Sequence, residues 1–169
     1  MPETSSINEM INDLVVSDEV DRSLDPLAAR RKAMDLLARR EHTKHELLEK
    51  LQKSGFEENT ALDAIEELAR EGLQSDRRFV EAFVQSRIRQ GKGPMRIRAD
   101  LSQRGVRDPV IHEVLSEADA DWAELAVEVR RKKFGDEGPA DLKDKARQMR
   151  FLQYRGFESD QVRAAVDAD

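Results

Sequence analysis

Hydrophobic residues recur along most of this chain every three or four positions, which is the spacing of amphipathic helices. The clearest stripe consists of Phe79, Val80, Phe83, Val84 and Ile88. The sequence lacks the alternation of apolar and polar residues that marks a half-buried strand. The pattern therefore predicts an all-α protein.

One helical unit occurs three times along the chain. The three copies are LLEKLQKSGFEENTALDAIEEL, RIRADLSQRGVRDPVIHEVLSE and ARQMRFLQYRGFESDQVRAAVD. Their glycines, Gly55, Gly105 and Gly156, are 50 and 51 residues apart, and an apolar residue follows each of them. Glycine adopts the left-handed conformation that ends a helix without the steric cost that a side chain adds. Each of these glycines is therefore predicted to end one helix before the next begins.

Polar residues in helix-capping positions support this division. Asp108 and Ser159 follow the second and third glycines and are predicted to be N-caps, and Asn59 takes that role in the first repeat. Thr43 and Glu46 have the spacing of a capping box, which predicts a helix start at this point. Gly93-Pro94 interrupts the second repeat, and proline favours the first turn of a new helix.

Together these signals predict nine principal helices in three tandem three-helix repeats that form an elongated, curved modular rod. The acidic N-terminal segment is predicted to be a flexible tail, with a short helix near Ile7–Val16 as an alternative. Trp122 is interpreted as a packing anchor or partial cap between repeats rather than as a platform for base stacking. The expected boundaries are 1–26 for the tail, 27–74 for the first repeat, 75–121 for the second and 122–169 for the third.

Charge is distributed unevenly along the chain. The 169 residues carry a formal net charge of -6, and residues 1–26, with seven acids and one arginine, account for all of it. Residues 77–107 contain nine Lys or Arg and two acids, which gives a local charge of +7. A positive segment of this kind can bind a polyanion even when the whole protein is acidic.

The centre of this segment is RIRQGKGPMRIR, residues 87–98, where a turn is expected to bring arginines of two helices together. The predicted nucleic-acid-binding residues are Arg77, Arg78, Arg87, Arg89, Lys92, Arg96, Arg98 and Arg104. A secondary basic surface is assigned to Arg39, Arg40, Arg130, Arg131, Lys132 and Lys133. Structural roles in the turns are assigned to Gly55, Gly93, Pro94, Gly105 and Gly156.

Signals for catalysis and metal binding are weak. The chain has no cysteine, and Gly91-Lys92-Gly93 lacks the first glycine and the Ser or Thr of a P-loop. His42 and His45 are interpreted as exposed polar residues at a helix start rather than as metal ligands. No apolar run is long enough to span a membrane. We therefore expect a cytoplasmic monomer with no enzymatic activity, cofactor or metal.

The glycine turns are similar to the helix-turn-helix motif, in which the helix after the turn enters the major groove of DNA. The corresponding helices here are acidic. Residues 58–71 contain five acids and one arginine, and residues 108–121 contain five acids and no Lys or Arg. DNA phosphates would repel such helices. The basic residues therefore favour sequence-independent contact with a nucleic-acid backbone.

The run SDRRFVEAFVQSRIRQGKGPMRIRADLSQRGV, residues 75–106, resembles the central segment of the RecX family, regulators of the RecA recombinase. The matching residues are Gly72-Leu73, Asp76-Arg77-Arg78-Phe79, Phe83, Arg87, Gly91, Gly93-Pro94, Ile97, Leu101 and Gly105. Three tandem three-helix repeats are also the architecture of that family, so the resemblance covers roughly residues 27–169. The acidic turn of the third repeat, residues 134–139, departs from the basic turn of the second.

The resemblance implies a regulator that binds the helical groove of the RecA–single-stranded-DNA filament. Such a protein inhibits filament extension, ATP hydrolysis, strand exchange and coprotease activity, and so acts in recombination, DNA repair and the SOS response. DNA alone would be bound weakly and without sequence preference. The residues themselves leave two alternatives: a sequence-specific helix-turn-helix DNA-binding regulator, and a helical adaptor that binds only proteins.

Overall fold

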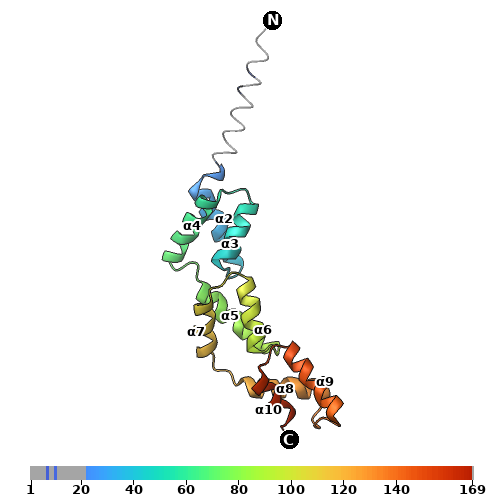
Figure 1. The fold of residues 1–169 in the computed structure, drawn as a ribbon. Helices are drawn as coiled ribbons and strands as arrows, with labels where there is room; N and C mark the ends of the chain where they lie inside the picture. Colours follow the sequence, from blue (N-terminus) through green and yellow to red (C-terminus); the bar gives the residue numbers. More distant parts are fainter. Residues whose placement is uncertain (1–6, 8–9, 11–21, 169) are drawn as a thin grey trace. The chain divides into compact units, whose positions relative to one another are not determined.

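The computed structural model describes residues 7, 10 and 22–168, and within residues 22–168 the chain forms nine α-helices and no strand (Figure 1). The prediction of an all-α protein is confirmed. The predicted tail and the alternative short helix near Ile7–Val16 lie largely outside the described residues. The helices are α2 (Pro26–Arg39), α3 (Lys44–Lys53), α4 (Glu58–Arg70), α5 (Asp76–Arg89), α6 (Pro94–Gln103), α7 (Asp108–Glu117), α8 (Trp122–Phe134), α9 (Leu142–Tyr154) and α10 (Ser159–Val166).

The chain divides into two compact units, with the boundary between Asp76 and Arg77. The first unit contains α2, α3 and α4, which each bury one face in a shared core. Residues four positions apart, such as Leu47 and Leu51 on α3, lie on the same face of a helix and are both fully buried. The buried residues of this core are Ala29, Ala33, Leu47, Leu51, Phe56, Ala61, Ala64, Ile65 and Leu68.

The second unit holds the other two repeats, each with its own core. The buried residues of the second repeat are Phe79, Val80, Phe83, Val84, Ile97, Leu101, Val106, Ile111, Val114 and Leu115. Those of the third repeat are Ala126, Leu152, Phe157, Val162, Ala165 and Val166. Trp122 begins α8 of the third repeat but packs against the core of the second. Its interpretation as a packing anchor between repeats is therefore confirmed.

The same glycine turn joins the last two helices of every repeat. Gly55, Gly105 and Gly156 have φ angles of 94°, 78° and 96°, as expected for a residue that ends a helix in the left-handed region. In each turn the next residue donates its backbone N–H to a leucine carbonyl five positions earlier, which satisfies a carbonyl at the helix end. The pairs are Phe56 with Leu51, Val106 with Leu101 and Phe157 with Leu152, with N···O distances of 3.1, 3.2 and 3.2 Å.

The helices that follow these glycines begin earlier than predicted. Their N-caps are Glu57, Arg107 and Glu158. Asp108 and Ser159 are the first residues of their helices, and Asn59 is the second residue of α4, so the three predicted caps are wrong. The longer carboxylates of the first and third caps reach the first-turn N–H groups instead. Thr43 is confirmed as a cap, since its hydroxyl oxygen accepts from the Glu46 N–H at 3.0 Å.

Candidate nucleic-acid interface

The positive segment around Gly93 forms a joint between the second and third repeats, inside the second unit. Gly91 and Gly93 lie in the turn between α5 and α6. The Gly93 N–H donates to the Arg155 carbonyl at 2.8 Å, and the Met95 N–H donates to the Gly156 carbonyl at 2.9 Å. The turn of the second repeat therefore docks, backbone to backbone, on the glycine turn of the third.

Glycine is required on both sides of this joint because the two backbones approach so closely. A Cβ atom on Gly93 would lie 2.3 Å from the carbonyl carbon of Gly156. A Cβ atom on Gly156 would lie 2.3 Å from the Cβ of Arg96, and the positive φ of Gly156 also disfavours a side chain. Gly93 has an ordinary φ of -82°, so only the lack of space excludes a larger residue there.

Arg77 is held by an ion-pair cluster within the second repeat. Its guanidinium pairs with Glu81 at 3.0 Å, with Glu113 at 2.8 Å and with Glu117. Hydrogen bonds to Glu113 and Glu81 raise the pKa of Arg77 above its ordinary value. Three carboxylates leave little positive potential at this guanidinium, so it contributes less to attraction of a polyanion than its sequence position suggests.

Three other arginines of the predicted binding set support packing. The Cζ atom of Arg87 lies 4.1 Å from the ring centroid of Phe83, and that of Arg104 lies 5.1 Å from the same ring. Arg96 donates through Nη1 to the Tyr154 carbonyl at 3.3 Å and lies 5.3 Å from the Tyr154 ring centroid. Cation–π contacts of this kind stabilise the fold while leaving the charge partly accessible.

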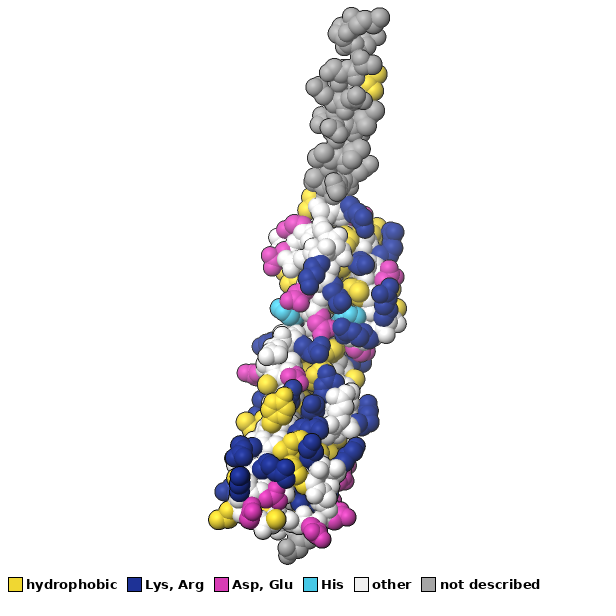
Figure 2. Space-filling model, turned by 90° about the vertical axis from the view of Figure 1, so that its right-hand side faces the viewer, with side chains coloured by type: hydrophobic (Ala, Val, Ile, Leu, Met, Phe, Trp, Pro, Cys, Tyr) yellow, Lys and Arg dark blue, Asp and Glu magenta, His cyan; other side chains and the backbone are white. Residues whose placement is uncertain are grey.

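Arg89, Lys92 and Arg98 are the members of the set best placed to meet a polyanion. Arg89 and Arg98 are exposed and Lys92 is half-buried. Within the described residues none of the three forms an ion pair. Arg78 is exposed as well. In the lower half of Figure 2, which is a view of the second unit, Lys and Arg side chains gather around hydrophobic side chains.

A pocket of about 570 Å³ opens beside the joint, within the second unit. Its apolar lining comes from Ile88, Leu125, Val129 and Phe151, and its basic lining from Arg89, Lys132, Lys133 and Arg155. Sequence reasoning did not single out Phe151 or Arg155. Arg155 immediately precedes a recognised turn glycine, but the sequence gives no sign that it donates to the Gln90 carbonyl of the preceding repeat at 3.1 Å.

The predicted secondary basic surface is divided between exposed and buried residues. Arg39, Arg131, Lys132 and Lys133 are exposed, and Arg40 pairs with Glu46 at 3.0 Å. Arg130 was expected on this surface but its side chain is completely buried, so that assignment is wrong. Its Nη1 donates to the Glu137 carbonyl at 3.2 Å and to Gln148 Oε1 at 3.4 Å, and it therefore supports the turn between α8 and α9.

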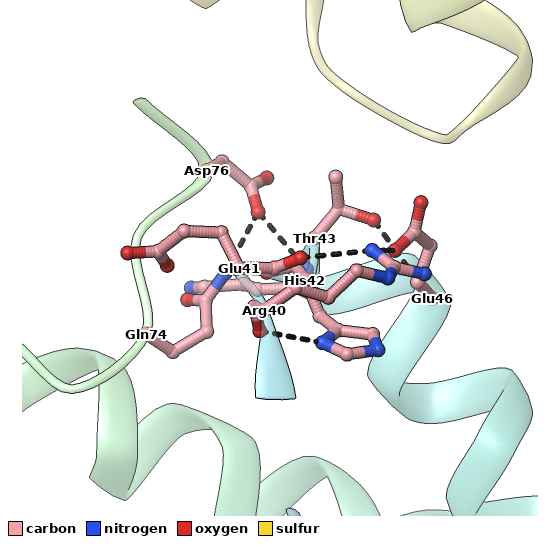
Figure 3. Close-up of polar contacts among 8 residues, drawn as sticks. Arg40, Glu41, His42, Thr43, Glu46, Gln74 and Asp76 are labelled. Atoms are coloured by element: carbon pink, nitrogen blue, oxygen red, sulfur yellow. Dashed lines mark hydrogen bonds and ion pairs between the residues drawn. The ribbon is translucent and has the colours of Figure 1, made fainter. Parts of the chain in front are cut away.

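Asp76, in the motif that carries the family resemblance, is a structural residue of the first unit. Its Oδ1 accepts from the Lys44 N–H at 2.9 Å and from the Gln74 side-chain amide at 2.9 Å (Figure 3). The same amide donates to the His42 carbonyl at 3.2 Å. A buried amide and one carboxylate thus fix the N-terminus of α3 against the chain that leaves α4.

His42 is buried in this cluster, not exposed as predicted. Only 2% of its surface is accessible, and its Nδ1 lies 3.0 Å from the Arg40 carbonyl (Figure 3). Burial lowers the pKa of His42 below its ordinary value of 6.5, because the charged imidazolium is poorly solvated there. His45, by contrast, is exposed and lies 3.3 Å from Glu49. The two histidines therefore do not share an environment.

We expect the first unit to lose stability as the pH falls below about 6.5. In that range the unfolded chain protonates His42 while the folded chain, with its lowered pKa, does not, so acid favours unfolding. Hydrogen exchange of α3 at pH 7.5 and pH 5.5, corrected for the intrinsic effect of pH, measures this loss. His42→Gln is expected to remove much of the pH dependence, and His45→Gln to leave it intact. Equal pH dependence in both variants would contradict the assignment.

The part of the chain that the structure describes contains neither a metal-binding cluster nor a membrane-spanning helix. No group of three or more His, Cys, Asp or Glu residues there could hold a metal ion. No helix among these residues is both long and apolar enough to cross a membrane.

Comparisons with known proteins match each repeat separately. The family model for the first three-helix domain of RecX matches residues 29–68, that for the second matches 75–115 and that for the third matches 119–166. The regulatory protein RecX of Halorhodospira halophila is 50% identical over 141 residues, covering 83% of this chain and 88% of the relative. That of Pseudomonas syringae pv. tomato is 45% identical over 137 residues, covering 81% and 88%.

Solved structures support the same fold. A crystal structure of a regulatory protein RecX matches with a TM-score of 0.73 at 20% identity, over 95% of this chain and 77% of the other. RecX from Lactobacillus salivarius matches with a TM-score of 0.73 at 19% identity, over 89% and 96%. The three family models match the three repeats in order. The relatives are up to 50% identical over most of the chain. The chain therefore belongs to the RecX family of regulatory proteins.

Proposed function

We propose that this protein binds the RecA–single-stranded-DNA filament and inhibits its extension, ATP hydrolysis, strand exchange and coprotease activity. We expect it to act as a cytoplasmic monomer without catalytic activity of its own. Membership of the RecX family supports this proposal. The structural observation that carries it is the group of accessible cations, Arg89, Lys92 and Arg98, on the turn between α5 and α6 and on the two helices that it joins.

These cations suit contact with a phosphate backbone rather than with base edges. They are presented from the end of α5, the turn after it and the middle of α6. A helix-turn-helix motif instead reads bases from its second helix, which in each repeat of this chain is the helix after the glycine turn. In the second repeat that helix is α7, which contains Asp108, Glu113 and Glu117 and no Lys or Arg. Binding to DNA alone is therefore expected to be weak, salt-sensitive and independent of sequence.

Titration of the full chain into a RecA–single-stranded-DNA ATPase assay tests the proposal. ATP hydrolysis should fall with added protein, and inhibition should weaken as the salt concentration rises. A parallel titration with naked single-stranded and duplex DNA separates the alternatives. Much tighter binding to one duplex sequence than to random duplex at the same salt would favour a sequence-specific regulator, and inhibition independent of salt and DNA would favour a protein-only adaptor. An unchanged ATPase would reject the proposal.

The paired substitution Lys92→Glu with Arg98→Glu is expected to raise the protein concentration needed for half-inhibition about tenfold, equivalent to about 1.4 kcal/mol. Both positions change from attracting to repelling phosphate, and neither side chain holds an ion pair within the described residues. The slope of log affinity for single-stranded DNA against log salt should also become shallower, by about 0.7 for each lost phosphate contact.

A matched control for this substitution is Lys50→Glu with Lys53→Glu. Both lysines are exposed on α3 of the first unit, and the change in net charge is the same. The control should inhibit nearly as well as the unmodified protein. If the two double variants lose inhibition equally, net charge rather than the surface beside the joint is responsible.

A further inference from the structure

We propose that the pocket between the second and third repeats binds an acidic peptide segment of the filament's protein component, with one apolar side chain of that segment inserted. This inference rests on the proposed function and assigns contact with DNA and contact with protein to different surfaces. Lys92 and Arg98 meet DNA, the pocket between α5, α8 and α9 meets protein, and Arg89 borders both surfaces. The pocket encloses about 570 Å³, within the range of sites that hold a compact ligand group.

The pocket has an apolar lining that contact with phosphates does not require. Ile88 comes from the end of α5, Leu125 and Val129 from α8, and Phe151 from α9. All four side chains are only partly buried, so apolar surface remains open to solvent in the pocket. A concave apolar lining with a few charged groups at its edge is the usual form of a binding site. An aliphatic or aromatic side chain would gain free energy by displacing water from it.

The charges around this lining favour an acidic partner. Arg89, Lys132 and Lys133 are exposed at the pocket, and within the described residues none of them forms an ion pair. Glu128 is the acidic residue of the lining, so four basic side chains, with Arg155 included, outnumber one carboxylate. Carboxylates on either side of an inserted side chain would thus meet cations that are not already neutralised.

A stacked nucleotide base is a poorer occupant because the aromatic ring in the pocket is already engaged. The ring of Phe151 packs edge-to-face on Phe134 with centroids 5.3 Å apart. The Nζ of Lys133 lies 5.8 Å and the Cζ of Arg155 lies 5.3 Å from its centroid. Platforms that bind single-stranded DNA leave an aromatic face free for a base. The other apolar lining residues are aliphatic and provide no such platform.

The test uses the full chain and a short fluorescent peptide in which one phenylalanine is flanked by aspartates and glutamates. Fluorescence anisotropy measures its binding beside two comparison probes: the same peptide with serine in place of phenylalanine, and an oligothymidylate. We expect the serine peptide to bind at least about tenfold more weakly, because it has no apolar ring to bury in the pocket. Equal binding of both peptides would mean that charge alone acts, and would overturn the proposal.

Two variants locate the peptide on the protein. Lys132→Glu with Lys133→Glu should weaken peptide binding about tenfold or more, and the matched control Arg31→Glu with Lys32→Glu, an adjacent exposed pair on α2, should not. Val129→Thr keeps the shape and charge of the pocket while adding a hydroxyl group to its lining. It should weaken peptide binding about threefold and leave oligothymidylate binding unchanged. Weaker oligothymidylate binding with unchanged peptide binding would assign the pocket to DNA instead.

Two further results would reject the assignment for separate reasons. Residues 1–26 contain seven acids and one arginine, so the test also includes this segment as an alternative occupant. If Glu9→Gln with Asp13→Asn and Asp18→Asn in the full chain raises peptide affinity many-fold, that segment occupies the pocket. Suppose that the unmodified chain inhibits RecA ATPase, while the Val129→Thr variant and the Lys132→Glu, Lys133→Glu double variant both bind the peptide as tightly as the unmodified chain. The pocket inference then fails and the proposed function stands. Absence of ATPase inhibition by the unmodified chain would instead reject the proposed function.

Discussion

Replacing Gly93 with alanine is expected to lower the free energy of unfolding of the second unit by about 1–3 kcal/mol and to weaken inhibition of the RecA filament. The backbone angles of Gly93 suit alanine, so strain in φ is not the cause. The added Cβ would lie 2.3 Å from a backbone carbon and 2.4 Å from a backbone nitrogen of the third repeat. Backbone cannot move aside as a flexible side chain can, so the joint must open.

Opening the joint removes specific interactions between the second and third repeats. The hydrogen bonds from Gly93 and Met95 to the Arg155 and Gly156 carbonyls connect the two turns directly. Each such bond contributes roughly 0.5–1.5 kcal/mol to stability. The cations on α5 and α6 would then lose their fixed position relative to α8. Inhibition should fall even where the individual repeats remain folded.

Gly138→Ala is the matched control for this substitution. Gly138 also precedes a proline in the corresponding turn of the third repeat, but an added Cβ there would have no atom within 4 Å. Alanine at such a position is expected to be neutral or to stabilise by about 0.4–1 kcal/mol, because it restricts the unfolded chain. Urea unfolding followed by Trp122 fluorescence and far-UV circular dichroism measures both variants. Equal stability of the two would contradict the close packing of the joint.

The sequence predicted the helices and the repeat because those features depend on local chemistry. The spacing of Leu47 and Leu51 identifies a helix face without knowledge of what covers it. The glycine turns could also be predicted from the sequence, because a left-handed residue followed by an apolar one is a local requirement of a helix end. The N-cap residues were harder to predict from the sequence. Glu57 caps α4, but glutamate is not among the residues preferred at N-caps, so Asn59 carried the stronger capping signal in the sequence.

The binding surface could be predicted only in part, because it depends on contacts between distant segments. The positive charge of residues 77–107 is visible in the sequence, but the partners of Arg77 come from α7 as well as from its own helix. The burial of Arg130 depends on the turn between α8 and α9 and on Gln148. Gly93 and Gly156 are both recognisable as turn residues, yet their contact with each other has no local signal.

Leu51→Ala is expected to unfold much of the first unit while leaving the second unit folded. Truncating a fully buried leucine costs about 2–5 kcal/mol. A small unit with about 0.05–0.15 kcal/mol of stability per residue has only a few kcal/mol in total. Leu51 is completely buried in the first core, which shares no buried residue with the cores of the other repeats. The loss should therefore be local.

Two probes separate the units in this experiment. The chain has one tryptophan, Trp122, and it packs against the core of the second repeat, so its fluorescence reports on the second unit. Hydrogen exchange of α3 and α4 reports on the first. Leu62→Ala is the control, because Leu62 lies on α4 with 37% of its surface exposed and its truncation leaves a much smaller cavity. A shift of the Trp122 transition in Leu51→Ala, but not in the control, would show that the two units unfold together.

Leu51→Ala also separates binding of DNA from inhibition of the filament. Arg89, Lys92 and Arg98 all lie in the second unit, so affinity for single-stranded DNA should stay within about twofold of the unmodified protein if these cations dominate it. Inhibition of RecA ATPase should fall much further, because three packed repeats can contact a filament over a larger surface than two. A parallel fall in both measurements would assign part of the DNA contact to the first unit, with exposed Arg39 as the first residue to test.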